Sequence, residues 1–215
     1  FDRQFMVNDG EMYSQYFLGW PALMVPGVWL GAPGVMNGIY SALTVPPLFF
    51  SLKRLAGGGV NRLASDRVAR WGTWIYLTSP MMMIGAATQL SHTSCVCLLA
   101  WVIYFVLRSR DPEAHWLNYS AVAVTFSIAF FIRPLSAVAI AAPLMGFCLT
   151  ATLNQSSGTR WRNLAAWALP VFVFAGVFLT VNHIQNDSAL TTAYSSARSY
   201  AESNGLRFST WKGKG

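Results

Sequence analysis

The chain of 215 residues is apolar and sparsely charged, with 54% hydrophobic and 11% charged residues. A soluble globular domain carries about 25% charged residues, so this composition excludes an ordinary soluble domain and indicates lipid as the solvent. The formal net charge is +7, but the basic residues lie mainly in loops between apolar runs. Such loops orient a membrane protein and seldom form a nucleic-acid groove, so we expect no nucleic-acid partner.

The first 33 residues are expected to form an external loop followed by interfacial helices. Residues 1–15 are polar, whereas residues 16–30 are apolar but interrupted by two glycines and two prolines. Such a segment makes a poor spanning helix. We therefore expect short helical pieces at the outer interface, with Trp20 and Trp29 anchored among the headgroups.

Residues 71–110 indicate a transmembrane hairpin. Two apolar runs, 71–90 and 93–107, flank the short polar apex Ser91-His92, and arginines lie at both outer ends but not at the apex. Because Lys and Arg collect in cytoplasmic loops, the apex is expected to face outside.

Six apolar runs approach the length of about 20 residues that a helix needs to cross a bilayer. The predicted fold class is all-α: a polytopic transmembrane helical bundle of six spans plus the interfacial broken helix. The expected domains are the external segment 1–33, the six-span core 34–182 and a truncated external loop 183–215. The predicted spans are 35–52, in which Pro46-Pro47 should cause a kink, 71–90, 93–107, 118–132, 135–152 and 164–181.

Motifs of several enzyme classes do not occur in the sequence. There is no Walker loop, no Rossmann glycine pattern, no HExxH and no GxSxG, which disfavours nucleotide-driven work and zinc proteolysis. Cys95, Cys97 and Cys148 lie inside apolar runs, so neither a disulfide framework nor a metal cage is indicated. The chain begins without Met or a signal peptide, and we expect it to be an internal fragment of a longer membrane protein.

Arg133 is the first candidate for binding an anionic group. It follows an apolar run and precedes Pro134, at the expected outer end of a span. An ionisable residue at membrane depth is costly and points to function, and a guanidinium forms a planar fork that fits phosphate oxygens. The alternative is that Arg133 snorkels to the headgroups.

His92, at the hairpin apex, is the candidate catalytic residue. It could be a metal ligand, a general base or a hydrogen-bonding group near a bound headgroup. The alternative is a simple turn in which Ser91 caps the following helix. The other two histidines, His115 and His183, are expected to be structural. The further outward-facing residues that we assign to substrate binding, together with Arg133, are Gln15, Tyr16, Ser91 and Tyr194.

The order of these segments resembles the membrane core of GT-C glycosyltransferases of the protein mannosyltransferase and aminoarabinose-transferase type, glycosyltransferase family 39. An external loop leads into YSQYFLGWPALMVPGVWLG, followed by a span ending LKRLAGGG and a span containing Thr78-Ser79-Pro80. The external Ser91-His92, a span ending in arginines and a span ending IRPLSA come next. The resemblance covers nearly the whole chain.

The resemblance implies an integral membrane transferase that moves a hexosyl or pentosyl group from a polyprenyl-phosphate carrier to a lipid, glycan or protein acceptor. The reaction would take place on the outer, periplasmic face. Family members use an acidic residue of the first external loop as the base or in a metal site. We expect this residue upstream of Phe1, so the fragment alone would be inactive. Arg133 would hold the phosphate, His92 would assist the base, and Tyr16 would line the carrier's entry. The resemblance establishes no cofactor, and it leaves the use of a divalent metal ion open.

Two other interpretations come from different functional classes. A transporter or flippase for lipids or small solutes would explain the spans interrupted by proline and glycine, although the lack of acidic residues within the spans disfavours proton coupling. A structural assembly subunit would explain the spans alone. The short loops favour a bacterial inner membrane as the location.

Overall fold

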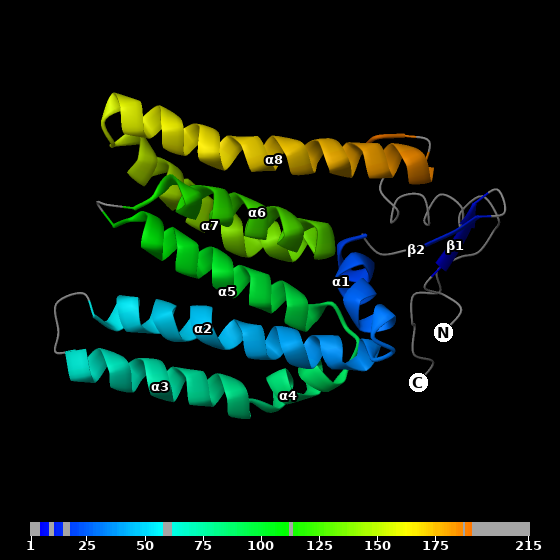
Figure 1. Ribbon diagram of the computed structural model, residues 1–215, viewed down its shortest axis with the longest axis horizontal. Helices are drawn as coiled ribbons and strands as arrows, with labels where there is room; N and C mark the ends of the chain where they lie inside the picture. Colours follow the sequence, from blue (N-terminus) through cyan, green and yellow to red (C-terminus); the bar gives the residue numbers. More distant parts are fainter. Residues whose placement is uncertain are drawn as a thin grey trace, which may run out of the picture. The chain divides into compact units, whose positions relative to one another are not determined.

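The computed structural model describes residues 5–8, 11–14, 18–57, 62–111, 114–186 and 188–190 (Figure 1). A short antiparallel hairpin near the N-terminus comprises β1 (Phe5–Asn8) and β2 (Glu11–Ser14), with Phe5 opposite Ser14. The chain divides into two compact units, residues 19–174 and residues 1–18 together with 175–215.

Helices make up the larger unit. They are α1 (Gly19–Trp29), the short 3-10 helix η1 (Pro33–Val35), α2 (Met36–Ala56), α3 (Arg62–Thr78), α4 (Pro80–Ala87), α5 (His92–Ser109), α6 (Trp116–Ile132), α7 (Pro134–Leu153) and α8 (Ser157–Asn186), which continues into the smaller unit. Among the described residues, four stretches are long and apolar enough to cross a membrane: Pro33–Ala56, His92–Ser109, Pro134–Leu153 and Ser157–Ile184. Trp116–Ile132 is a shorter apolar helix. The predicted all-α membrane helical bundle is confirmed.

Helices α2 and α5 lie at the centre of the larger unit. α2 packs between α3 and α5, and α5 also packs against α6 and α7 (Figure 1). Small residues occupy the closest contacts, since Ala123 of α6 and Ala137 and Ala141 of α7 are fully buried. Small side chains let helix backbones approach each other, as is typical of bundles that assemble in lipid.

The second predicted span differs from the structure. Helix α3 begins at Arg62, so the stretch that we expected to be a basic loop is helical. The helix then ends at Thr78, and α4 begins at Pro80, because Ser79 is extended at φ −64° and ψ 122°. Proline lacks an N–H, and its ring disfavours helical geometry in the preceding residue. The prediction of one continuous helix over 71–90 is therefore wrong.

Proline does not interrupt the other helices in the same way. Helix α2 continues through Pro46 and Pro47. The segment 16–30, predicted as short helical pieces, contains the single helix α1 of 11 residues with Pro26 inside it. At 1.5 Å per residue α1 is about 16 Å long, roughly half of what a membrane span needs.

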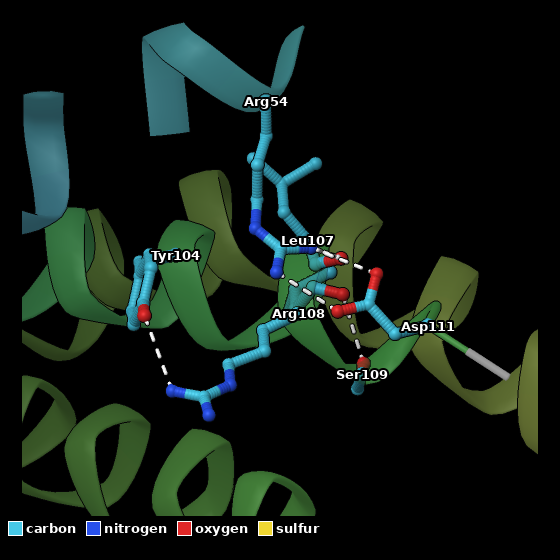
Figure 2. Close-up of polar contacts among 7 residues, drawn as sticks. Arg54, Tyr104, Leu107, Arg108, Ser109 and Asp111 are labelled. Carbon is cyan, nitrogen blue, oxygen red and sulfur yellow. Dashed lines mark hydrogen bonds and ion pairs between the residues drawn. The ribbon is translucent and has the colours of Figure 1, made fainter. Parts of the chain in front are cut away.

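Two ion pairs join helix ends where Lys and Arg are concentrated. Lys53 Nζ lies 2.6 Å from Asp66 Oδ1 and links α2 to α3. The Arg54 guanidinium donates to both carboxylate oxygens of Asp111 at 2.9 and 2.8 Å, and to the Leu107 carbonyl oxygen at 3.4 Å (Figure 2). Arg54 therefore holds the C-terminal end of α5 and the turn that follows it. We call this end of the bundle, where α2 and α5 finish, the basic end.

The substitution Asp111→Asn is expected to destabilise the protein at neutral pH but not in acid. The hydrogen bond from Arg54 holds the pKa of Asp111 below its ordinary value. The pair therefore contributes stability above the ordinary carboxyl pKa of about 4, and this contribution is lost as the pH falls through the lowered pKa. Because the Asp111 side chain is 47% exposed, the loss should stay within about 0.2–1 kcal/mol.

Thermal unfolding of both proteins in detergent, from about pH 7 to about pH 3, measures this effect. The wild type should unfold at the higher temperature at neutral pH, and the difference should vanish in acid. A difference that stays constant across the range would show that the charge of Asp111 is not its cause.

Candidate functional site

Arg133 lies at the junction between α6 and α7. Its backbone N–H donates to the Ala129 carbonyl at 2.9 Å, and its carbonyl accepts from the Ala137 N–H at 2.9 Å. The residue itself is not helical, with φ −148° and ψ 84°, and Pro134 follows as the first residue of α7. Proline suits that position because the N–H it lacks would have no partner within the helix. The pair Arg133-Pro134 thus turns the chain at the end of the bundle opposite to the basic end.

His92 and Arg133 lie at the same end of the bundle, where α5 begins and α6 ends. His92 is the first residue of α5, and it lies close enough to Arg133 for their charges to interact. The same guanidinium acts electrostatically on Cys95, one turn further along α5. Arg133 therefore lies within the range of a charge interaction from the first two turns of α5.

Ser91 occupies the N-cap position of α5 but does not cap the helix with its side chain. Its backbone is helical, at φ −68° and ψ −1°, and its side chain forms no capping hydrogen bond. Its carbonyl oxygen accepts from the Cys95 N–H at 3.2 Å and from the Ser94 hydroxyl at 3.0 Å. The capping role that we considered as an alternative for Ser91 is therefore wrong, because a helical backbone at this position turns the hydroxyl away from the first-turn N–H groups.

Two helix N-termini add to the positive potential around Arg133. Helices α5 and α7 both begin at this end, and neither carries an acidic residue in its first turn. The aligned peptide dipoles place about half a positive charge at a helix N-terminus, and its first N–H groups can bind an anion. Together with a guanidinium, this arrangement suits a phosphate group.

The loop between α4 and α5 is held by side chains of two other helices. Asn37, in the first turn of α2, donates from Nδ2 to the carbonyl oxygens of Thr88 and Leu90 at 2.5 and 2.8 Å. Trp20 of α1 donates from Nε1 to the Gln89 carbonyl oxygen at 3.0 Å. The Asn37 side chain is buried, with 1% of the residue exposed. These bonds fix the backbone that carries the apex.

Sequence reasoning missed both of these donors. Asn37 could have been singled out as an amide near the start of an apolar span, where an unpaired polar group is costly. Trp20 was expected only as a headgroup anchor. The partners of the two side chains could not have been named, since the bonds reach across 51 to 69 residues of sequence.

Helix α1 links the apex loop to the end of α6. A Cβ added to Gly19 would lie 2.6 Å from the backbone carbonyl of Phe131, so glycine permits an approach that other residues do not. The next residue, Trp20, reaches the apex loop, and the Tyr40 hydroxyl of α2 donates to the Leu23 carbonyl at 3.0 Å. The position of α1 therefore couples Arg133's junction to the apex.

The substitution Gly19→Ala is expected to push α1 away from α6 and to loosen the apex loop. The new methyl group would overlap backbone atoms, and overpacking of this kind costs about 1–3 kcal/mol. Gly146→Ala in α7 is the matched control, because nothing lies within 4 Å of the added Cβ. Amide hydrogen exchange over residues 88–92 should quicken in Gly19→Ala alone. Equal exchange in both variants and the wild type would contradict the role of α1.

The remaining predicted site residues are not placed by the described part of the structure. Gln15, Tyr16 and Tyr194 lie outside the described residues. His115 is the N-cap of α6, where its Nδ1 accepts from the Leu117 N–H at 3.3 Å, in agreement with a structural role. Among the side chains that the structure describes, no group of three or more His, Cys, Asp or Glu could hold a metal ion.

Within residues 18–57, 62–111, 114–186 and 188–190, the two acidic residues, Asp66 and Asp111, lie at the basic end. Asp66 pairs with Lys53, and Asp111 pairs with Arg54. Asp111 follows the C-terminus of α5, whereas His92 begins that helix of 18 residues, so about 27 Å of helix separates them. Neither carboxylate can act beside Arg133.

The model of the Alg9-like mannosyltransferase family matches residues 20–190, which include α1, the apex loop and Arg133. The chain belongs to the Alg9-like mannosyltransferase family. The family consists of membrane glycosyltransferases of the GT-C type, so the predicted enzyme class and membrane core are confirmed.

Family membership also corrects one expectation from the sequence. The specific resemblance to glycosyltransferase family 39 is not supported, because the matching model describes another family. The order of spans and external loops had indicated the broader GT-C class, but the short motifs did not separate one of its families from another. No curated protein and no solved structure matches the chain.

Proposed function

We propose that the protein transfers mannose from a polyprenyl-phosphate carrier to a lipid, glycan or protein acceptor at the outer face of the membrane. The family supports the sugar and the reaction class. The observation that carries the proposal is that Arg133, between α6 and α7, lies at the end of the bundle where α5 begins with His92. A guanidinium and helix N–H groups at the end of a membrane bundle suit the phosphate of a lipid carrier.

The proposed roles follow from the charges in the reaction. The bond between the sugar and the carrier phosphate breaks, the acceptor oxygen forms the new bond to the sugar, and the phosphate leaves with additional negative charge. Arg133 and the first-turn N–H groups of α5 would stabilise that charge. Ser91, whose hydroxyl is not used in capping, would add a donor.

A base must take the proton of the acceptor hydroxyl. His92 would assist at this step, but we expect the principal base to be a carboxylate. Because Asp66 and Asp111 are held at the basic end, this carboxylate must come from outside the described side chains. In this proposal, Arg133 and the N-terminus of α5 bind the phosphate, and the carboxylate that acts as the base comes from another segment of the protein.

The outer face is proposed from the distribution of charge. Lys53, Arg54 and Arg108 lie at the end of the bundle opposite to Arg133 and the apex, and basic residues collect on the cytoplasmic side. On this proposal the protein lies in a bacterial inner membrane with its site open to the periplasm. The donor would then enter from the outer leaflet.

Reconstitution of the full-length protein in sealed vesicles tests the proposal. Radiolabelled polyprenyl-phosphate mannose should pass its sugar to an acceptor mixture, whereas a nucleotide-linked mannose should not. Transfer from the nucleotide donor would contradict the carrier. Movement of the labelled lipid between leaflets without any new covalent product would favour the transporter interpretation. Repeating the assay with EDTA decides whether a divalent metal ion takes part.

A further inference from the structure

One face of α3 carries two arginines and two tryptophans. Arg67, Arg70, Trp71 and Trp74 follow one another at intervals of three, one and three residues, which places them side by side on an α-helix. They line a pocket of about 460 Å³. Trp71 and Trp74 are 65% and 60% exposed. We call these four residues the Arg–Trp face.

The Arg–Trp face points away from the rest of the larger unit. Helix α3 lies at the edge of this unit, where it packs against α2 and α4 (Figure 1). Its buried residues, Ser65, Ala69 and Thr73, lie on the opposite side of the helix. In a membrane protein, such an outward face at the end of a bundle meets lipid.

The described carboxylates offset the charge of this face only in part, because Asp66 interacts electrostatically with Arg70 as well as with Lys53. Asp66 lies 2.6 Å from Lys53, and Asp111 is bound by Arg54. Arg70 donates from Nε to the backbone carbonyl of Asp66 at 3.3 Å, which leaves its other guanidinium nitrogens for a further acceptor. Two guanidinium groups thus stand beside two exposed indole rings.

We propose that the Arg–Trp face binds the headgroup of an anionic phospholipid in the leaflet at the basic end. A guanidinium can donate two hydrogen bonds to phosphate oxygens, and indole rings settle where headgroups meet acyl chains. The order along α3 fits this ligand, since the arginines precede the tryptophans and the apolar part of the helix follows. A zwitterionic headgroup carries an ammonium group that would be repelled by the two guanidinium groups, so the Arg–Trp face should bind anionic lipids in preference.

Native mass spectrometry of the full-length protein in neutral detergent tests this site. With phosphatidylglycerol and phosphatidylcholine added in equal amounts, the wild type should retain phosphatidylglycerol. The double variant Arg67→Gln/Arg70→Gln should lose roughly 10- to 30-fold of that preference. Arg62→Gln is the matched control for each single substitution, Arg67→Gln or Arg70→Gln, because it removes one positive charge from the same helix but not from the Arg–Trp face.

Four results would overturn the proposal. Equal retention of both lipids by the wild type would remove the selectivity, and a loss in Arg62→Gln equal to that in the single variants would assign it to overall charge. Displacement of the lipid by inorganic phosphate at the same concentration would identify a site for soluble anions. Dimers that disappear in the double variant would show that a second copy covers the face. If the double variant does not fold, each single substitution should still lose part of the preference.

Discussion

Replacing Arg133 by alanine in the full-length protein is expected to reduce sugar transfer by about 10²–10³-fold, as the loss of one preorganised donor to a developing anion does in other enzymes. Arg133 lies at the end of the bundle where α5 begins, and the leaving phosphate would bind there. Arg133→Lys keeps the charge but loses the planar fork of the guanidinium, so its activity should lie between that of the wild type and that of Arg133→Ala. Initial rates of mannose transfer from the lipid carrier measure the effect.

Arg162→Ala is the matched control for this substitution. Arg162 is an exposed arginine in the first turns of α8, and its removal should leave transfer unchanged. The amount of each variant in the membrane and its unfolding temperature show whether the bundle is intact. If Arg133→Ala inserts normally and transfers at the wild-type rate, Arg133 does not bind the phosphate.

The substitution Asn37→Ala is expected to be the most damaging change outside the proposed site. It removes the donor to the Thr88 and Leu90 carbonyl groups, which costs about 2 kcal/mol when the acceptors are left unpaired. For a chain of this size that loss lowers the unfolding temperature by roughly 4–8 °C. Transfer should fall as well, because the apex that carries His92 would no longer be held near Arg133.

Thr44→Ala separates the loss of stability from the loss of positioning. Thr44 is as buried as Asn37 and belongs to the same helix. Its hydroxyl donates to the Tyr40 carbonyl at 2.8 Å within that helix, and its side chain also bonds the Cys97 thiol of α5, not the apex loop. This variant should keep its transfer rate even where it loses stability. A parallel fall of transfer in Thr44→Ala and Asn37→Ala would show that the apex bonds have no separate role.

The helices of the core could be predicted because lipid leaves few alternatives. A backbone without water must satisfy its hydrogen bonds internally, so each apolar run predicts a helix. The runs 93–107, 118–132 and 135–152 agree with α5, α6 and α7 to within a few residues. The expectation that His92 and Arg133 share one face followed from the alternation of spans, since both lie at turns on the same side.

The same reasoning failed where charge and helix coexist. The basic stretch 61–70 is predicted to be a cytoplasmic loop because it is rich in arginine and precedes an apolar run, but arginine is a good helix former. A helix at this position needs only one face that packs against its neighbours, and the buried residues Ser65 and Ala69 lie on that face. Conversely, hydropathy alone predicts one helix over the apolar run 71–90, but Ser79-Pro80 divides it into α3 and α4.

The sequence by itself determined the solvent, the fold class, the helical segments and which turns share an end of the bundle, because these depend on composition and on local hydrogen bonding. Only the tertiary structure decided how the apex is held by Asn37 and Trp20, and how Arg54 joins α2 to Asp111. These contacts depend on how helices pack. Each needs a donor and an acceptor from distant parts of the chain to lie within about 3 Å of each other, and no local pattern records that distance.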